Sequence, residues 1–245
     1  MLVTDATTIT VIFILGLSTL VRSAIGFGDG LIAMGLLTSL VGLKTASPLV
    51  ALVGTPISLS ILLSQYKQVK IKTVLPLIIS TLIGIPFGLV LLKFVPEQVG
   101  RGMLGLLLVV YGTYSLLGLK LPEITTDKFA HLFGFIAGIL GGAYTTNGPL
   151  IVIYGNLKRW EPQQFRLMLQ GYFFCTNFLI LAGHALSGLW TIRVWSLALM
   201  SLPVIGVSVW LGSIVNQRIN RKFFTKFVFT LLLIIGLLSL FQSIN

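Results

Sequence analysis

Two short polar breaks interrupt otherwise apolar sequence at matching places in the two halves of the chain. The first is Gly26-Phe27-Gly28-Asp29-Gly30, and the second is Thr145-Thr146-Asn147-Gly148-Pro149. An offset of 118 residues places Asp29 on Asn147. Paired interruptions of apolar segments are typical of ligand sites built from broken helices inside membranes. The two breaks are therefore the candidate site.

Each break is expected to open a helix, and a helix N-terminus favours negative charge. Asp29 and Asn147 are good N-cap residues, and Pro149 suits a first helical turn. The first N–H groups of a helix lack partners and the helix dipole is positive there, so an anion is favoured. The alternative is that the glycines only let helices pack closely and the polar residues only cap. The predicted substrate-binding residues are Gly28, Asp29, Gly30, Thr145, Thr146, Asn147, Gly148, Arg22, Gln170 and Asn177.

Arg22 and Asp29 are the charged residues of the first pair of apolar segments. Charge within a membrane is costly and therefore marks functional candidates. Arg22 could attract an anion directly, be neutralised by Asp29, or extend to a nearby interface. Asp29 is the candidate for proton coupling, with a simple capping role as the alternative.

Gln170 and Asn177 lie two helical turns apart and share a face, so they could complete the wall of the site. Hydrogen bonding between helices is the alternative for either residue. The matching stretch of the first half, Thr55-Pro56-Ile57-Ser58-Leu59-Ser60, predicts a proline kink with two serines. His131 and His184 lie near segment ends and are expected at the membrane interface, with a proton relay as the alternative. We expect no metal and no cofactor, since two distant histidines make no metal motif.

The composition indicates that the breaks lie within a lipid bilayer. Of the 245 residues 56% are hydrophobic and 9% are charged, and the mean hydropathy is +1.01. The apolar runs approach or exceed the roughly 20 helical residues that cross a bilayer, and they are too long for barrel strands. We therefore predict an all-α polytopic membrane protein. The net charge of +11 comes from basic residues in short loops, so no nucleic-acid partner is expected.

One pattern of five helical segments is used twice. The expected segments are 6–24, 29–42, 45–64, 72–92 and 98–119, then 128–143, 147–157, 162–184, 192–214 and 221–243. Glycines match at Gly16 with Gly134, Gly30 with Gly148, and Gly84 with Gly206, which supports a duplication. The predicted division is a first transmembrane repeat at 1–119, a linker at 120–128 and a second repeat at 129–245.

The basic residues predict the orientation of the two repeats. If the first two segments of each half return to the side they entered, twelve Lys and Arg residues lie on one side and four on the other. If each pair crosses once, the division is ten to six. The positive-inside rule favours the first arrangement, with both termini non-cytoplasmic. The repeats are then inverted relative to each other, and each broken pair is a re-entrant hairpin or, as the alternative, two short crossings.

The motifs, in their order and spacing, resemble the TauE/SafE sulfite exporter family, also called TSUP. The similarity lies in Gly26-Phe27-Gly28-Asp29-Gly30-Leu31-Ile32, Gly134-Phe135-Ile136-Ala137-Gly138 and Asn147-Gly148-Pro149-Leu150-Ile151-Val152. The family pattern often has glycine at the position of Asp29 and proline near Gly35. The resemblance implies a carrier in the inner membrane of a bacterial-type cell. Its substrates would be small sulfur-containing anions such as sulfite, sulfoacetate or related organosulfur acids, commonly for export.

Together these patterns predict a secondary transporter that holds an anion between the two breaks and works by alternating access. The sequence lacks a Gly-x-x-x-x-Gly-Lys loop, so a proton, another ion or the substrate's own gradient is expected to drive it. The alternative is an anion-selective channel, which needs a continuous pore. An enzyme is not expected, because Asp29 is the one carboxylate within the apolar segments and has no acidic partner. The expected partners are the anion, a coupling ion, the lipid bilayer and further copies of the chain in a homo-oligomer.

Overall fold

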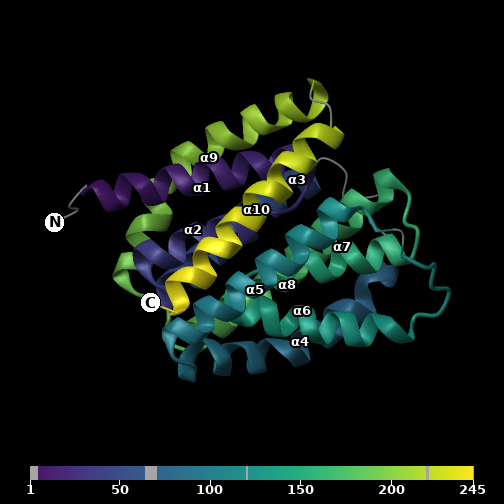
Figure 1. Cartoon of the computed structure of the whole chain (residues 1–245), viewed down its shortest axis with the longest axis horizontal. Helices are drawn as coiled ribbons and strands as arrows, with labels where there is room; N and C mark the ends of the chain where they lie inside the picture. Colours follow the sequence, from purple (N-terminus) through teal and green to yellow (C-terminus); the bar gives the residue numbers. More distant parts are fainter. Residues whose placement is uncertain (1–4, 64–70, 120, 219–220, 245) are drawn as a thin grey trace.

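The computed structural model describes residues 5–63, 71–119, 121–218 and 221–244. Within these ranges the chain forms ten α-helices and no strand, so the predicted all-α fold is confirmed (Figure 1). The first five are α1 (Ala6–Ile25), α2 (Asp29–Val41), α3 (Leu43–Leu63), α4 (Ile71–Phe94) and α5 (Glu97–Leu117). The second five are α6 (Lys128–Tyr144), α7 (Gly148–Leu157), α8 (Pro162–Leu186), α9 (Ile192–Arg218) and α10 (Arg221–Ile244).

Local sequence explains where α1, the helix before the first break, begins and ends. Asp5 caps α1, because its carboxylate accepts hydrogen bonds from the backbone and side chain of Thr8, which also lower the pKa of Asp5. Helix α1 ends at Gly26, which has a φ of 96° and donates its N–H to the Arg22 carbonyl. Glycine adopts this left-handed conformation without steric cost. At most helix ends, the predicted segments agree with the observed helices to within a few residues.

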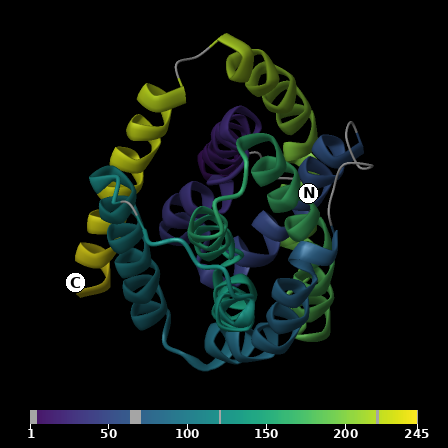
Figure 2. The same ribbon diagram turned by 90° about the vertical axis from the view of Figure 1, so that its right-hand side faces the viewer.

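Five helices are long and apolar enough to cross a membrane, namely α1, α4, α5, α9 and α10. Their outward faces carry large apolar side chains such as Phe13, Phe87 and Trp210, which suits contact with lipid. Figure 2 shows α4, α5, α9 and α10 around the outside of the molecule, with α2 and α7 inside. The chain is thus a multi-pass membrane protein.

The two helices that follow the breaks are short. Helix α2 has 13 residues and α7 has 10, which correspond to about 20 Å and about 15 Å of helix. A hydrocarbon core is about 30 Å thick, so neither helix crosses it alone. Most residues of both helices are buried in the protein, as expected for short helices surrounded by longer ones. Whether the hairpins are re-entrant stays a prediction.

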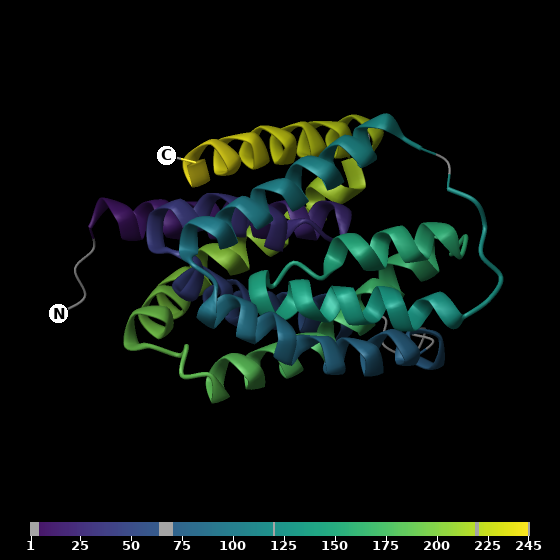
Figure 3. The same cartoon turned by 60° about the horizontal axis from the view of Figure 1, so that its bottom comes forward.

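The most extensive contacts pair helices from the two halves: α4 with α6, α5 with α10, α1 with α9 and α3 with α8. Figure 3 shows α10 along α5 and α4 along α6. The fourth helix of each half thus packs on the first helix of the other half. This exchange suits the predicted duplication, while the division at 1–119 and 129–245 and the inverted orientation stay predictions.

Glycines bring α4 and α6 into backbone contact. A Cβ on Gly84 would clash with the carbonyl oxygen of Phe135, and one on Gly134 would clash with the carbonyl oxygen of Leu77. Small residues at helix contacts are the usual way for membrane helices to pack closely. Gly206, which the sequence matched with Gly84, makes no such contact, because a Cβ there would meet nothing within 4 Å.

Parts of two predictions fall outside the described residues. Lys67, Lys70 and Lys120 belong to the basic residues that were counted for orientation, and the structure does not describe them. The same holds for the last residue of the segment expected at 45–64 and the first residue of the linker expected at 120–128. The orientation of the termini stays a prediction.

Candidate anion-binding site

The two breaks meet in the interior of the bundle. A Cβ on Gly30 would lie 2.6 Å from the carbonyl oxygen of Thr145 and 3.7 Å from the Thr146 methyl group. Real side chains do not approach a carbonyl oxygen this closely, so residue 30 has to be glycine for the first turn of α2 to pack on the second break. The sequence matched Gly30 with Gly148, and the structure brings both to one place.

A cavity of about 30 Å³ lies where the breaks meet. It is lined by Arg22, Gly28, Asp29, Gly30, Leu31, Val50, Gly54, Thr145, Thr146, Asn147, Gly148, Pro149, Phe173 and Asn177. Nine of the ten residues predicted to bind substrate are in this set, and the tenth, Gln170, contacts Arg22 instead. A volume of this size holds roughly two waters. The cavity is therefore suited to a small ligand.

Both helix N-termini at the cavity lack a side-chain cap. Gly28, with a φ of 98°, precedes α2 and makes no side-chain bond, so the predicted N-cap role of Asp29 is wrong: Asp29 is the first helical residue. Asn147 does occupy the N-cap position of α7, but its side chain does not cap. Its amide nitrogen donates to Thr176 Oγ1 at 3.1 Å. The positive ends of two helices therefore face one small space without a side-chain cap, although the Asp29 carboxylate lies in the first turn of α2.

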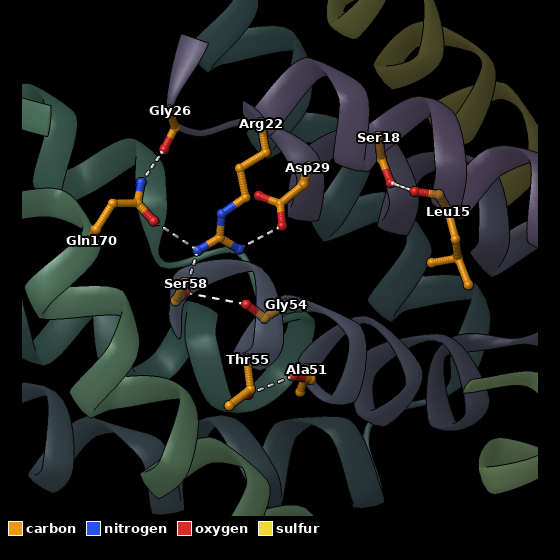
Figure 4. A network of polar contacts seen from close by, with 10 residues as sticks. All are labelled: Leu15, Ser18, Arg22, Gly26, Asp29, Ala51, Gly54, Thr55, Ser58 and Gln170. Carbon is orange, nitrogen blue, oxygen red and sulfur yellow. Dashed lines mark hydrogen bonds and ion pairs between the residues drawn. The ribbon is translucent and has the colours of Figure 1, made fainter. Parts of the chain in front are cut away.

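Arg22 is the centre of a polar network beside the cavity (Figure 4). Its Nη1 donates to Asp29 Oδ2 at 2.7 Å, and its Nη2 donates to Ser58 Oγ and to Gln170 Oε1. Gln170 in turn donates to the Gly26 carbonyl at 2.7 Å. Arg22 is only 3% exposed, so it does not extend to an interface. The structure shows Arg22 paired with Asp29, and direct attraction of an anion by Arg22 stays a prediction.

Two buried donors at the cavity have no hydrogen-bond partner within the described part of the chain: Thr146 Oγ1 and Arg22 Nε. Thr146 is 2% exposed and lines the cavity. An unpaired buried hydroxyl costs about 1–3 kcal/mol, a cost that a bound anion would remove. The predicted hydroxyl group of Thr145 is different, because it donates to the Ser47 carbonyl at 2.9 Å.

Comparison with known protein families matches residues 11–239 to the family described as Sulfite exporter TauE/SafE. The chain belongs to the TauE/SafE family. The match includes both breaks and every residue that lines the cavity. No match was found among curated proteins or solved structures. The chain is thus a membrane transporter of a family whose substrates are sulfur-containing anions such as sulfite.

His184 occupies an unexpected position in this TauE/SafE member. It is fully buried, and its Nε2 lies 3.1 Å from the Gly142 carbonyl oxygen and 3.4 Å from Ser47 Oγ. The prediction of an interfacial His184 is therefore wrong, because the imidazole links α8 to α6 and α3 inside the bundle. His131 is exposed and lies 2.8 Å from Ser80 Oγ.

Five lining residues were not among the predicted binding residues, namely Leu31, Val50, Gly54, Pro149 and Phe173, and two of them contact Arg22. A Cβ on Gly54 would lie 3.3 Å from Arg22 Nη1 and 3.5 Å from Asn177 Nδ2, so this glycine lets α3 pack against the polar side chains. Its one signal was its place just before the kink predicted at Pro56. The Phe173 ring lies 5.2 Å from the Arg22 guanidinium carbon. Nothing distinguishes Phe173 from its aromatic neighbours in the sequence.

Proposed function

We propose that this TauE/SafE member is a secondary carrier that exports a small sulfur-containing anion across the inner membrane. Sulfite, sulfoacetate and related organosulfur acids are the proposed substrates. The observation that carries the proposal is the convergence of two helix N-termini and one buried arginine on a single cavity. Each of these groups favours negative charge, and none of them favours a cation.

The proposed binding mode uses backbone and side-chain donors together. The anion accepts from the free N–H groups at the start of α2, near Gly30, and at the start of α7, near Gly148. Thr146 Oγ1 donates from the second break, and Asn147 and Asn177 complete the wall. Gln170 acts on the anion only through Arg22, which it positions. The small cavity favours the compact charged head of the substrate.

Asp29 is the proposed proton-binding group. Arg22 and Asp29 form a neutral pair when the site is empty, so an anion adds an uncompensated negative charge to a buried space. Protonation of Asp29 would release Arg22 Nη1 towards the anion and restore neutrality. Anion affinity should therefore rise as the pH falls.

Alternating access is the proposed mechanism. The fourth helix of each half packs along the first helix of the other half through close contacts, Gly84 in one pair and Gly16 beside Val204 in the other. Inverted repeats that rock about a central site are a common basis for such carriers. The breaks then remain in contact with the anion while opposite sides of the bundle open in turn. Both termini are placed outside the cytoplasm in this proposal.

The test is transport by the purified protein in liposomes. We expect saturable sulfite flux that thiosulfate and sulfoacetate compete for and that sulfite on the opposite side stimulates. Flux that neither saturates nor responds to sulfite on the opposite side would indicate a channel and overturn the carrier. The double variant Thr146→Leu with Asn147→Leu should lose anion binding, and unchanged binding would contradict the proposed site.

A further inference from the structure

Phe27 lines a second, larger cavity, and the next residue, Gly28, lines the anion cavity. Gly26 and Gly28 flank Phe27, both in the left-handed conformation, and Phe27 itself belongs to no helix. Its half-buried side chain packs against both of the larger apolar clusters of the protein, and its ring centroid lies 6.3 Å from that of Phe229. The Gly26 backbone is held by hydrogen bonds to Arg22 and Gln170, so a change of position at Phe27 would have to come from its side-chain torsions.

The second cavity has a volume of about 340 Å³ and lies between α5, α7, α8 and α10. Phe27, Phe165 and Phe229 supply its apolar rings. Ser115, Asn156 and Thr225 supply a few hydroxyl and amide groups. Pockets for small organic ligands typically combine aromatic walls with a few polar groups. We call this space the aromatic cavity.

A third cavity continues the aromatic cavity away from Phe27. The two share Tyr114, Leu119 and Asn156 in their walls, and the third has a volume of about 480 Å³. Arg159 and Glu161 both line it. Arg159 Nη2 donates to the Leu121 carbonyl at 3.2 Å, which fixes the guanidinium at this position. A charged molecule can therefore meet polar groups before it reaches the aromatic rings.

We propose that the aromatic cavity is a subsite for the organic group of a sulfonate whose charged head occupies the anion cavity. The inference rests on the proposed function and extends it to one substrate class, small aromatic or aliphatic sulfonates. Phe27 moves aside to connect the two spaces, and it limits the size of the organic group. The aromatic cavity is large enough, since a cavity of about 150 Å³ in another protein holds benzene. The anion cavity, at about 30 Å³, cannot hold such a group.

The test compares two sulfonates with the same charged head as inhibitors of sulfite flux in liposomes. Methanesulfonate can use only the anion cavity, whereas benzenesulfonate can use both. We expect benzenesulfonate to inhibit at a concentration about tenfold lower, because burial of its ring adds apolar contact. Equal potency of the two compounds would overturn the subsite.

The variant Thr225→Trp tests whether the stronger inhibition by benzenesulfonate arises from binding in the aromatic cavity. Thr225 lines the aromatic cavity from α10, and a tryptophan there would fill it. We expect the inhibitory concentration of benzenesulfonate to rise about tenfold, while methanesulfonate inhibition and sulfite flux change less than about twofold. The matched control is Thr230→Trp, because Thr230 is exposed on the same helix. The control should leave both sulfonates unaffected.

Phe27→Ala is a second variant, which tests the subsite even if Thr225→Trp does not fold. Loss of the ring should make 2-naphthalenesulfonate a better inhibitor while methanesulfonate stays as it was. If sulfite flux is intact and no sulfonate responds to either variant, the subsite is wrong and the proposed function stands. If the wild-type protein moves no sulfite or other small sulfur anion, the proposed function itself is wrong.

Discussion

Gly30 lies against Thr145 so closely that a Cβ on residue 30 would be 2.6 Å from the Thr145 carbonyl oxygen. This contact joins the start of α2 to the second break, and it holds two helix N-termini beside one cavity. It therefore connects the packing of the two halves of the chain with the place where we propose that the anion binds.

Gly30→Ala should displace the start of α2 from the second break. We expect sulfite flux to fall by about tenfold or more and the protein to lose about 1–3 kcal/mol of stability, the usual cost of overpacking. Transport in liposomes and thermal unfolding of the purified protein measure the two effects. Gly206→Ala is the matched control, since a Cβ there meets open space. Equal behaviour of the two variants would show that the contact is unimportant.

Thr146→Val removes an unpartnered buried hydroxyl and keeps the shape of the side chain. We expect unchanged or slightly higher stability and an increase in the KM for sulfite of about tenfold, because a hydrogen bond to a charged group is worth about 1.5–3 kcal/mol. Thr19→Val is the control, because Thr19 Oγ1 is also buried without a partner in the described residues but lies outside the cavity. A KM that rises equally in both variants would argue against Thr146 as a ligand.

Asp29→Asn should remove the part of the pH dependence of anion binding that comes from residue 29. The amide carries no charge, so Arg22 is free for the anion at every pH, and the KM for sulfite should fall about tenfold at neutral pH. The measurement is sulfite KM between acidic and alkaline pH, with Asp127→Asn as the control. Asp127 is exposed and pairs with Lys158 at 2.6 Å, away from the cavity. Because sulfite titrates equally in both experiments, a pH profile of Asp29→Asn that matches the control would exclude proton coupling through Asp29.

Gly84→Ala should destabilise the protein more than any substitution at the breaks. A Cβ on residue 84 would clash with backbone atoms of α6. Contacts along the whole helix fix the position of α6, so neither helix can shift easily to relieve the clash. Thermal unfolding or the yield of folded protein in detergent would measure this. A melting temperature equal to that of the wild type would mean that the packing of α4 on α6 is more adaptable than described.

The helices and the positions of the two breaks could be predicted from the sequence because both depend on local signals. Long apolar runs predict the spans, and the polar breaks predict where α1 and α6 end, at Gly26 and at Thr145. The partners of each side chain could not be predicted, since they depend on which helices meet. Asp29 has the sequence signature of an N-cap but pairs with Arg22, because the chain turns back at Gly26 and Gly28.

The surroundings of His184 and Gly206 could not be predicted from the sequence either. His184 is near the end of its segment, which suggests an interface, yet α3 and α6 cover it completely. Gly206 matches Gly84 by spacing along the chain, yet one lies at a helix contact and the other does not. Spacing gives the position along a helix, whereas burial depends on the rotation of that helix against its neighbours.

The most direct test of the central claim is to locate a bound anion. Selenite has the shape and charge of sulfite, and selenium can be identified by its anomalous scattering in crystals of the purified protein. We predict a selenium peak in the cavity lined by Arg22, Gly30 and Thr146, and loss of that peak in the double variant Thr146→Leu with Asn147→Leu. Selenite bound elsewhere, with this cavity empty, would contradict the proposed site.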